Sequence, residues 1–278
     1  MKLNFIKTNP TENMTVFILD QVSRDEYVDI ANKIMNYNNI NAEQVGFVEK
    51  PTYPNGEACA KLHMMGGEFC GNATRALAAV MVDRHQCKYN YSDNKIHVTL
   101  EVSGADKSIS CEVIPTFKKG KFISGVEMPL HEMIYDYEIE YDAERYKGTM
   151  VEFQGIMHLI IELDDNASKE EFFEKVKEDF KYKEYDALGI MFSNKKDYSM
   201  VPLVYVKATG SLIWERGCGS GATAMGIAVS YEQKKEVDIT IKQPGGELQV
   251  TTKWDGNDVT KLFLNGDVEI VAEGVLQV

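Results

Sequence analysis

Apolar and polar residues alternate over short stretches along most of this chain, and only a few stretches carry apolar residues at helical spacing. Alternation with a period of two is typical of strands that bury one face. In the first half it predicts strands at residues 2–7, 14–20, 45–49, 58–64, 96–102, 108–114 and 122–128. A turn rich in Asn and Pro separates the first two strands, so we expect them to form a hairpin.

Two helices interrupt these strands. Residues 23–37 place apolar side chains on one helical face, at Tyr27, Ile30, Ala31, Ile34 and Met35. Ser23, followed three residues later by Glu26, predicts a capping box at the start of this helix. An alanine-rich run predicts the second helix at residues 71–83, which is expected to bury Leu77, Val80 and Met81.

The second half repeats this order of elements. Strands are predicted at residues 150–153, 158–163, 188–192, 200–206, 237–242, 247–252, 261–264 and 268–272. One helix is predicted from Ser168, with Glu171 in a capping box and an apolar face made by Phe172, Phe173 and Val176. Another is predicted at residues 220–231, with Met225, Ile227 and Val229 buried. The repeated order indicates a duplicated unit.

Runs of neighbouring strands around few helices indicate an α+β fold, with a mixed, largely antiparallel sheet in each half. We expect each sheet to wrap around its alanine-rich helix. The domains are predicted at residues 1–133 and 134–278, and the last strand is left free to cross back to the first domain. The acidic, tyrosine-rich residues 134–146 predict a linker followed by an edge strand.

Composition narrows the classes of function. The chain has 278 residues, a formal net charge of −13 and a sequence pI of about 4.9. Binding to nucleic acid needs clustered Lys and Arg, which this sequence lacks. Residues 1–6 alternate like a strand rather than a signal peptide, and no apolar run approaches the ~18 residues of a membrane helix. We therefore expect a cytoplasmic protein with no nucleic-acid or membrane partner.

The five cysteines do not form a disulfide or metal pattern. Their number is odd and their spacing irregular, at Cys59, Cys70, Cys87, Cys111 and Cys218. Cys59 and His63 lie four apart in a predicted strand, too far from each other to chelate one ion. No metal site is predicted.

Two of the cysteines, however, lie in matching motifs. Residues 68–74 and 216–223 each place a cysteine before a glycine, a small polar residue and an alanine-rich helix. A helix start carries partial positive charge and unpaired N–H groups, which favour a thiolate and can bind a carboxylate. The glycines Gly71 and Gly219 let backbone approach a ligand closely.

Two such thiols can invert a stereocentre without a cofactor. A thiolate takes the α-proton of an amino acid from one face, and a thiol returns a proton to the other. The helix starts stabilise the charge that develops on the carboxylate. The alternative is that each of these two cysteines is only packed in the core. Cys59, Cys87 and Cys111 lack the glycine and the helix start, so we expect them to be ordinary strand or surface cysteines.

With these motifs the chain resembles the diaminopimelate epimerase-like family of amino-acid racemases, which work without pyridoxal phosphate. The resemblance runs along the whole chain and rests on the early Asn turn, residues 43–47, both cysteine motifs and residues 243–246. It implies two pseudo-symmetric domains, each a sheet wrapped round a central helix, with the site in the cleft between them. It also implies no cofactor and a small amino acid as substrate.

The resemblance further implies roles for individual residues. Cys70 and Cys218 would form the acid/base pair, and the substrate would be held by Asn13, Gln44, Gly71, Asn72, His158, Glu215, Gly219 and Ser220. Among these, the glycines with Asn72 and Ser220 would hold the α-carboxylate, His158 would lie near the first cysteine, and Glu215 would contact the α-amino group. Two alternatives stay open: a packed strand histidine for His158 and a solvent-facing charge for Glu215.

Departures from the family bear on the substrate. Diaminopimelate epimerases carry asparagines where this chain has Met64, Ile156 and Ile190 and their neighbours. Buried polar groups of a substrate need polar partners, so diaminopimelate fits poorly. Residues 67–74 and 212–221 look more like the histidine racemases of this fold, so the predicted function is interconversion of L- and D-histidine. Diaminopimelate epimerisation, racemisation of another amino acid and an amino-acid-binding scaffold remain alternatives, and a homodimer is left open.

Overall fold

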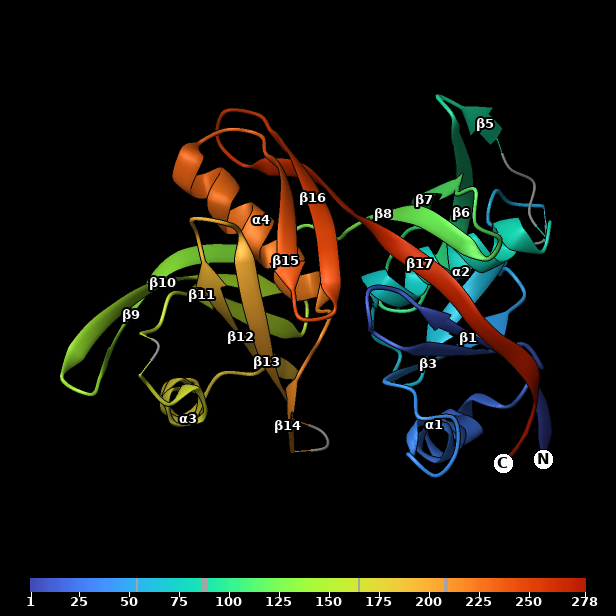
Figure 1. The fold of residues 1–278 in the computed structure, drawn as a ribbon, viewed down its shortest axis with the longest axis horizontal. Coiled ribbons are helices and arrows are strands. Elements are labelled where there is room, and N and C mark those ends of the chain that lie inside the picture. Colours follow the sequence, from blue (N-terminus) through green and yellow to red (C-terminus); the bar gives the residue numbers. More distant parts are fainter. Residues whose placement is uncertain (54, 87–89, 165, 208–209) are drawn as a thin grey trace. The chain divides into compact units, whose positions relative to one another are not determined.

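The computed structural model describes residues 1–53, 55–86, 90–164, 166–207 and 210–278. The chain divides into two compact units, one formed by Met1–Glu127 with Leu264–Val278 and the other by Met128–Phe263 (Figure 1). Both are α+β. Within the described part of the chain, no helix is both long enough and apolar enough to cross a bilayer.

The first unit is a sheet that closes on itself. Its strands are β1 (Lys2–Asn9), β2 (Thr15–Ile18), β3 (Gln44–Glu49), β4 (Ala60–Met64), β5 (Asn90–Ser92), β6 (Lys95–Val102), β7 (Ile109–Pro115), β8 (Lys121–Glu127) and the C-terminal part of β17 (Val259–Gln277). β1 and β2 are antiparallel, which confirms the predicted hairpin. β2 with β3 and β4 with β6 are parallel, whereas β3–β4, β6–β7 and β7–β8 are antiparallel. β17 pairs with both β1 and β8 and so joins the two ends of the sheet.

The helix α2 (Gly71–Asp83) fills the interior of this closed sheet. All its residues from Gly71 to Val82 are buried, including Leu77, Val80 and Met81 as predicted. It packs against β2, β6, β7 and β8. Its alanines let the surrounding backbone approach closely, and its larger side chains each contribute roughly 1.5–3 kcal/mol by leaving water.

The helix α1 (Tyr27–Met35) packs with a second core of the first unit. It buries Tyr27, Ile30 and Ile34 together with Val45 and Phe47 of β3. The predicted capping box is wrong: the Ser23 hydroxyl donates to the Asp25 carboxylate and caps no backbone N–H. The segment enters α1 instead through a 3₁₀ turn, η1 (Arg24–Glu26). A side chain bonded within its own turn cannot cap the helix.

The second unit repeats this pairing scheme. Its strands are β9 (Met133–Tyr141), β10 (Glu144–Phe153), β11 (Ile156–Ile161), β12 (Ala187–Asn194), β13 (Ser199–Val206), β14 (Ser211–Trp214), β15 (Asp238–Gln243), β16 (Gly246–Trp254) and the start of β17. β10–β11 and β12–β13 are antiparallel, β11–β12 and β13–β15 parallel, and β15–β16 antiparallel. The same alternation runs through β1, β2, β3, β4, β6 and β7, so the two units are pseudo-symmetric.

The prediction that residues 134–146 form a linker followed by an edge strand is wrong. They lie in the antiparallel hairpin of β9 and β10 (Figure 1). Its tyrosines alternate, so that Tyr135, Tyr137 and Tyr141 pack against the core of the second unit. The turn at Asp142 and Ala143 has φ of 52° and 63° without a glycine, so the usual sequence signal for a two-residue hairpin turn is missing.

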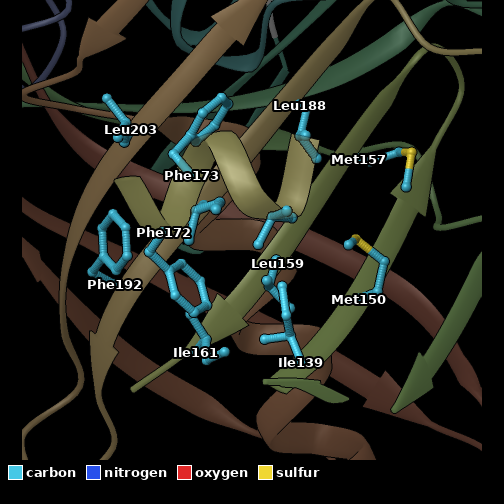
Figure 2. Packing of buried hydrophobic residues seen from close by; sticks show 12 residues of the cluster. Ile139, Met150, Met157, Leu159, Ile161, Phe172, Phe173, Leu188, Phe192 and Leu203 are labelled. Carbon is cyan, nitrogen blue, oxygen red and sulfur yellow. The ribbon is translucent and has the colours of Figure 1, made fainter. Parts of the chain in front are cut away.

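Two helices flank the second sheet. α3 (Lys169–Asp179) begins after Ser168, whose hydroxyl accepts a hydrogen bond from the Glu171 N–H at 3.3 Å, which confirms the serine cap of the predicted capping box. The Glu171 carboxylate accepts from the Tyr141 hydroxyl at 3.3 Å. Figure 2 shows Phe172 and Phe173 of this helix packed among aliphatic side chains of the strands. α4 (Gly219–Gln233) packs against β10, β11, β12 and β16 and buries Met225, Ile227 and Val229 as predicted.

The strands predicted at 261–264 and 268–272 form one continuous strand, β17. It stays extended through Asn265 and Gly266 because both of its edges find partners, with Lys2 opposite Gln277 at one end of the β1 ladder. Gly125 of β8 leaves room for it, since a Cβ there would lie 1.9 Å from Asn265 Oδ1.

Candidate active site

Both motif cysteines are N-caps of central helices. Cys70 and Cys218 have extended backbone, and α2 and α4 begin at the glycine that follows each of them. Cys70 Sγ accepts from the Ala73 N–H at 3.5 Å, and Cys218 Sγ accepts from the Gly221 N–H at 3.3 Å. Each sulfur therefore lies against the unpaired N–H groups and the positive end of its helix.

A buried polar network surrounds the start of α2. Asn72, only 3% exposed, donates from Nδ2 to Asn13 Oδ1 at 3.4 Å. Asn13 in turn donates to Glu43 Oε2 at 3.0 Å. Gln44 follows Glu43 at the start of β3, where it pairs with Thr15 of β2. The first unit thus gathers Asn13 and Asn72, with Gln44 next along the chain from their partner Glu43.

Arg75 belongs to this network and was not predicted. It is fully buried, and its guanidinium donates to Asn72 Oδ1 at 3.1 Å, Thr11 Oγ1 at 2.8 Å and the Asp267 carbonyl at 2.9 Å. Burial lowers the pKa of Arg75 to about 10, which leaves it charged at neutral pH. The available signal was a single charged residue inside an otherwise buried, apolar helix, because such a charge must be paired.

The start of α4 is held by Gln243. The Cys218 N–H donates to Gln243 Oε1 at 2.7 Å, and Cys218 is itself only 4% exposed. Its sulfur lies 3.6 Å from Ser220 Oγ. Gly221 has no room for a side chain, since a Cβ there would lie 2.2 Å from Met191 Sδ. A larger residue would therefore have to displace the buried side chain of Met191 on β12.

His158 contacts this second helix start. Its Nε2 lies 2.9 Å from Ser220 Oγ, whereas its Nδ1 has no hydrogen-bond partner within the described residues. Burial lowers the pKa of His158 to about 3, so the imidazole is neutral. A Cβ at Gly189, its partner on β12, would lie 2.4 Å from Nδ1. The family resemblance associates His158 with the first cysteine, but its contact in this unit is beside the second.

Glu215 also acts on the second cysteine. It is half-buried, and its carboxylate interacts with the Cys218 thiol. Burial, and then the charge and hydrogen bond of Glu215, raise the pKa of Cys218 well above its ordinary value. Glu215 is therefore not a purely solvent-facing charge, and Cys218 favours the thiol form.

Neighbouring residues of β12 lie in two different environments, the hydrophobic core and the start of α4. Ile190 is fully buried in the core that α3 covers, so this side chain gives no evidence about the substrate. Neighbours on a strand point to opposite faces. Gly189 and Met191, on either side of it, are the residues of β12 whose atoms approach His158 and the start of α4.

The remaining cysteines have different surroundings. Cys111 is fully buried within β7, and burial raises its pKa. Cys59 is half-buried before β4, and Cys87 lies outside the described residues. Across the described ranges, no three His, Cys, Asp or Glu side chains are grouped so as to hold a metal ion.

Comparison with known proteins identifies the family. Residues 2–277 match the family described as "Histidine racemase CntK N-terminal domain". The chain is 35% identical to a histidine racemase of Fusobacterium nucleatum over 99% of its own length and 97% of the relative's, and 29% identical to one of Staphylococcus aureus over 98% and 96%. A diaminopimelate epimerase of Methanothermobacter thermautotrophicus is 26% identical over 75% of this chain and 73% of its own.

Solved structures show the same fold at low identity. A hydroxyproline epimerase from Agrobacterium vitis, with bound trans-4-hydroxy-L-proline, matches with a TM-score of 0.67 at 8% identity, covering 99% of this chain and 92% of its own. A predicted epimerase from Pseudomonas aeruginosa matches with a TM-score of 0.67 at 11% identity, covering 99% of both chains. These structures show the fold, whereas the family match over residues 2–277 and the histidine racemases that are similar over nearly the whole chain show the class of protein. The chain is a racemase/epimerase-type isomerase and belongs to the histidine racemase family.

Proposed function

We propose that this protein interconverts L- and D-histidine, with Cys70 and Cys218 as its two catalytic acid/base groups and no cofactor. One observation carries the mechanism: both cysteines cap buried central helices at equivalent points of a duplicated fold. The substrate follows from the relatives, because those named histidine racemase match nearly the whole chain and the diaminopimelate epimerase matches three quarters of it.

Two sulfurs are enough to account for each proton and electron pair in the reaction. A thiolate on one face takes the α-proton of histidine and becomes a thiol, while the electron pair of the broken C–H bond spreads into the α-carboxylate. The thiol on the other face then gives its proton to the α-carbon and becomes a thiolate. The N–H groups at the starts of α2 and α4, with Asn72 and Ser220, would hold the carboxylate as its charge grows. Asn13, Gln44, Glu215 and His158 are the further residues that we assign to substrate binding.

Solvent exchange tests both parts of this proposal. L-Histidine incubated with the protein in D₂O should gain deuterium at the α-carbon and lose optical activity. Cys70→Ser and Cys218→Ser should lower the rate of racemisation by about 10²–10⁴-fold, whereas the matched Cys59→Ser should keep it. Full activity in either of the first two variants would refute the two-base scheme. Exchange with diaminopimelate or another amino acid but not histidine would refute only the substrate.

Oxidation tests whether the two sulfurs meet at one substrate. If they do, mild oxidant without substrate should join Cys70 to Cys218, and histidine should slow this reaction. Two thiols that stay reduced and equally reactive with and without histidine would count against a shared site.

An amino-acid-binding scaffold is the non-enzyme alternative. Calorimetric binding of histidine without any deuterium uptake would favour it. The cytoplasmic location stays a prediction, to be tested by cell fractionation, and light scattering would test for the homodimer that the sequence leaves open.

A further inference from the structure

We propose that Arg75 is a positioning residue that makes Cys70, rather than Cys218, the cysteine that carries the thiolate before substrate binds. This inference rests on the proposed two-cysteine mechanism and names the group that breaks its symmetry. It concerns only contacts within the first unit.

The geometry of Arg75 fixes its direction of action. Its buried guanidinium bonds to acceptors from α2, from the turn before β2 and from β17, namely Asn72 Oδ1, Thr11 Oγ1 and the Asp267 carbonyl. A guanidinium can only donate. The Asn72 amide must therefore turn its oxygen to Arg75, which leaves its Nδ2 to donate to Asn13 Oδ1.

The other end of the network is anchored by the Glu43 carboxylate. Asn13 accepts from Asn72, so its own Nδ2 donates to Glu43, a carboxylate that only accepts when ionised. A cation at one end and an anion at the other thus set the orientation of two amides that we assign to the substrate site. Loss of Arg75 removes the donor that holds the Asn72 oxygen in this orientation.

The charge of Arg75 acts on Cys70. Burial lowers the pKa of Arg75, while the negative charge of Cys70 and then that of Asp267 raise it. The buried guanidinium bonds to the side chain of Asn72, two residues after Cys70, so a cation lies near the start of α2 and favours negative charge on the Cys70 sulfur. Asp267 is exposed on β17, Glu43 is separated from Arg75 by two amides, and β8 contributes the neutral Ser124 hydroxyl, bonded to the Arg75 carbonyl.

The second helix start has a different arrangement. Thr223 occupies the place on α4 that Arg75 occupies on α2, five residues after the cysteine. Its hydroxyl donates to the Gly219 carbonyl at 2.8 Å and carries no charge. Cys218 instead interacts with the Glu215 carboxylate, which disfavours a second negative charge. Equivalent backbone positions therefore favour thiolate at Cys70 and thiol at Cys218.

Alkylation of Cys70 tests the charge effect without turnover. The rate of its reaction with iodoacetamide, followed by mass spectrometry of the Cys70 peptide across pH, reports the thiolate fraction. In Arg75→Met the midpoint should rise by about one pH unit or more. The matched control Arg84→Met, which removes a half-buried cation paired with Glu273 at the other end of the helix, should leave the midpoint unchanged.

Arg75→Lys separates position from charge. Lysine keeps the cation but cannot reproduce the three directed bonds, so the midpoint should stay near that of the wild type while KM for histidine rises about tenfold. A folded Arg75→Met with the wild-type midpoint overturns the proposal, and so does Arg75→Lys with unchanged KM and kcat. Since alkylation needs no substrate, a failure of histidine to react would not be mistaken for a failure of Arg75.

Discussion

The starts of α2 and α4 share a backbone design and differ in their side chains. Each presents a cysteine cap, a glycine and N–H groups bonded to sulfur. Around Cys70 the partners are amides tied to a buried cation. Around Cys218 they are the Glu215 carboxylate, a glutamine amide and the Ser220 hydroxyl, which contacts a neutral histidine. Duplication thus supplies matched geometry, and a few substitutions near each cap assign the two caps different protonation states.

Replacement of the cysteines tests the shared part of this comparison and has the largest expected effect. Cys70→Ser and Cys218→Ser should each lower kcat for racemisation by about 10²–10⁴-fold, because a hydroxyl is a poor proton acceptor at neutral pH. Steady-state polarimetry measures the loss. If the two variants differ in which histidine enantiomer still exchanges its α-proton, the difference gives the face that each cysteine serves.

Acid should destabilise the protein through His158, which contacts the start of α4, and not through Arg75 at the start of α2. The folded pKa of His158, about 3, lies below the ordinary value of about 6.5. The unfolded chain therefore binds the additional proton between these values, and the free energy of unfolding should fall by about 1.4 kcal/mol per pH unit as pH drops below about 6.5. Urea titrations of the wild type and His158→Gln measure this slope, and parallel slopes would contradict the assignment. Arg75 stays charged over the same range.

Exchange of the residue three places after each cysteine sharpens the comparison of packing. Gly221→Ala places a Cβ against Met191 and should lower the free energy of unfolding by about 1–3 kcal/mol. Ala73→Gly, the reciprocal change in α2, should cost only about 0.5–1 kcal/mol of backbone entropy. Chemical denaturation measures both. A rescue of Gly221→Ala by Met191→Ala would locate the clash, and its absence would place the strain elsewhere.

The smallest expected difference in stability is between the serines at the starts of α3 and α1. Ser168→Ala removes a working N-cap from α3 and should cost about 1 kcal/mol. Ser23→Ala should cost little, because its hydroxyl bonds to Asp25 rather than to a backbone N–H. Equal losses in the two variants would show that Ser23 caps α1 in solution.

Local pattern was enough to predict the central helices and most strands. Burial makes period-two and helical spacing visible, and a Cys-Gly step before an alanine-rich run is a strong start signal, so the predicted ranges of α2 and α4 agree with the structure to within two residues. The Ser168 cap was predicted for the same reason, since its partner is only three residues away.

The features that could not be predicted from the sequence depend on contacts between residues that are distant in sequence. The three acceptors of Arg75 come from three separate segments, and no local pattern brings them together. β17 looked like two strands because its continuity comes from pairing with β1 and β8. Ile190 and Met191 are equally apolar, so composition could not tell which of them faces the core and which the helix start.

The path of β17 also bears on how the chain folds. Residues 264–278 follow the whole of the second unit in sequence, yet they complete the sheet of the first. During synthesis the second unit can therefore finish before the first. Until β17 arrives, β1 and β8 each keep an open strand edge, which is the kind of surface that pairs with other chains. The unit that begins first is completed last, and its open edges are the part of the nascent protein most exposed to aggregation.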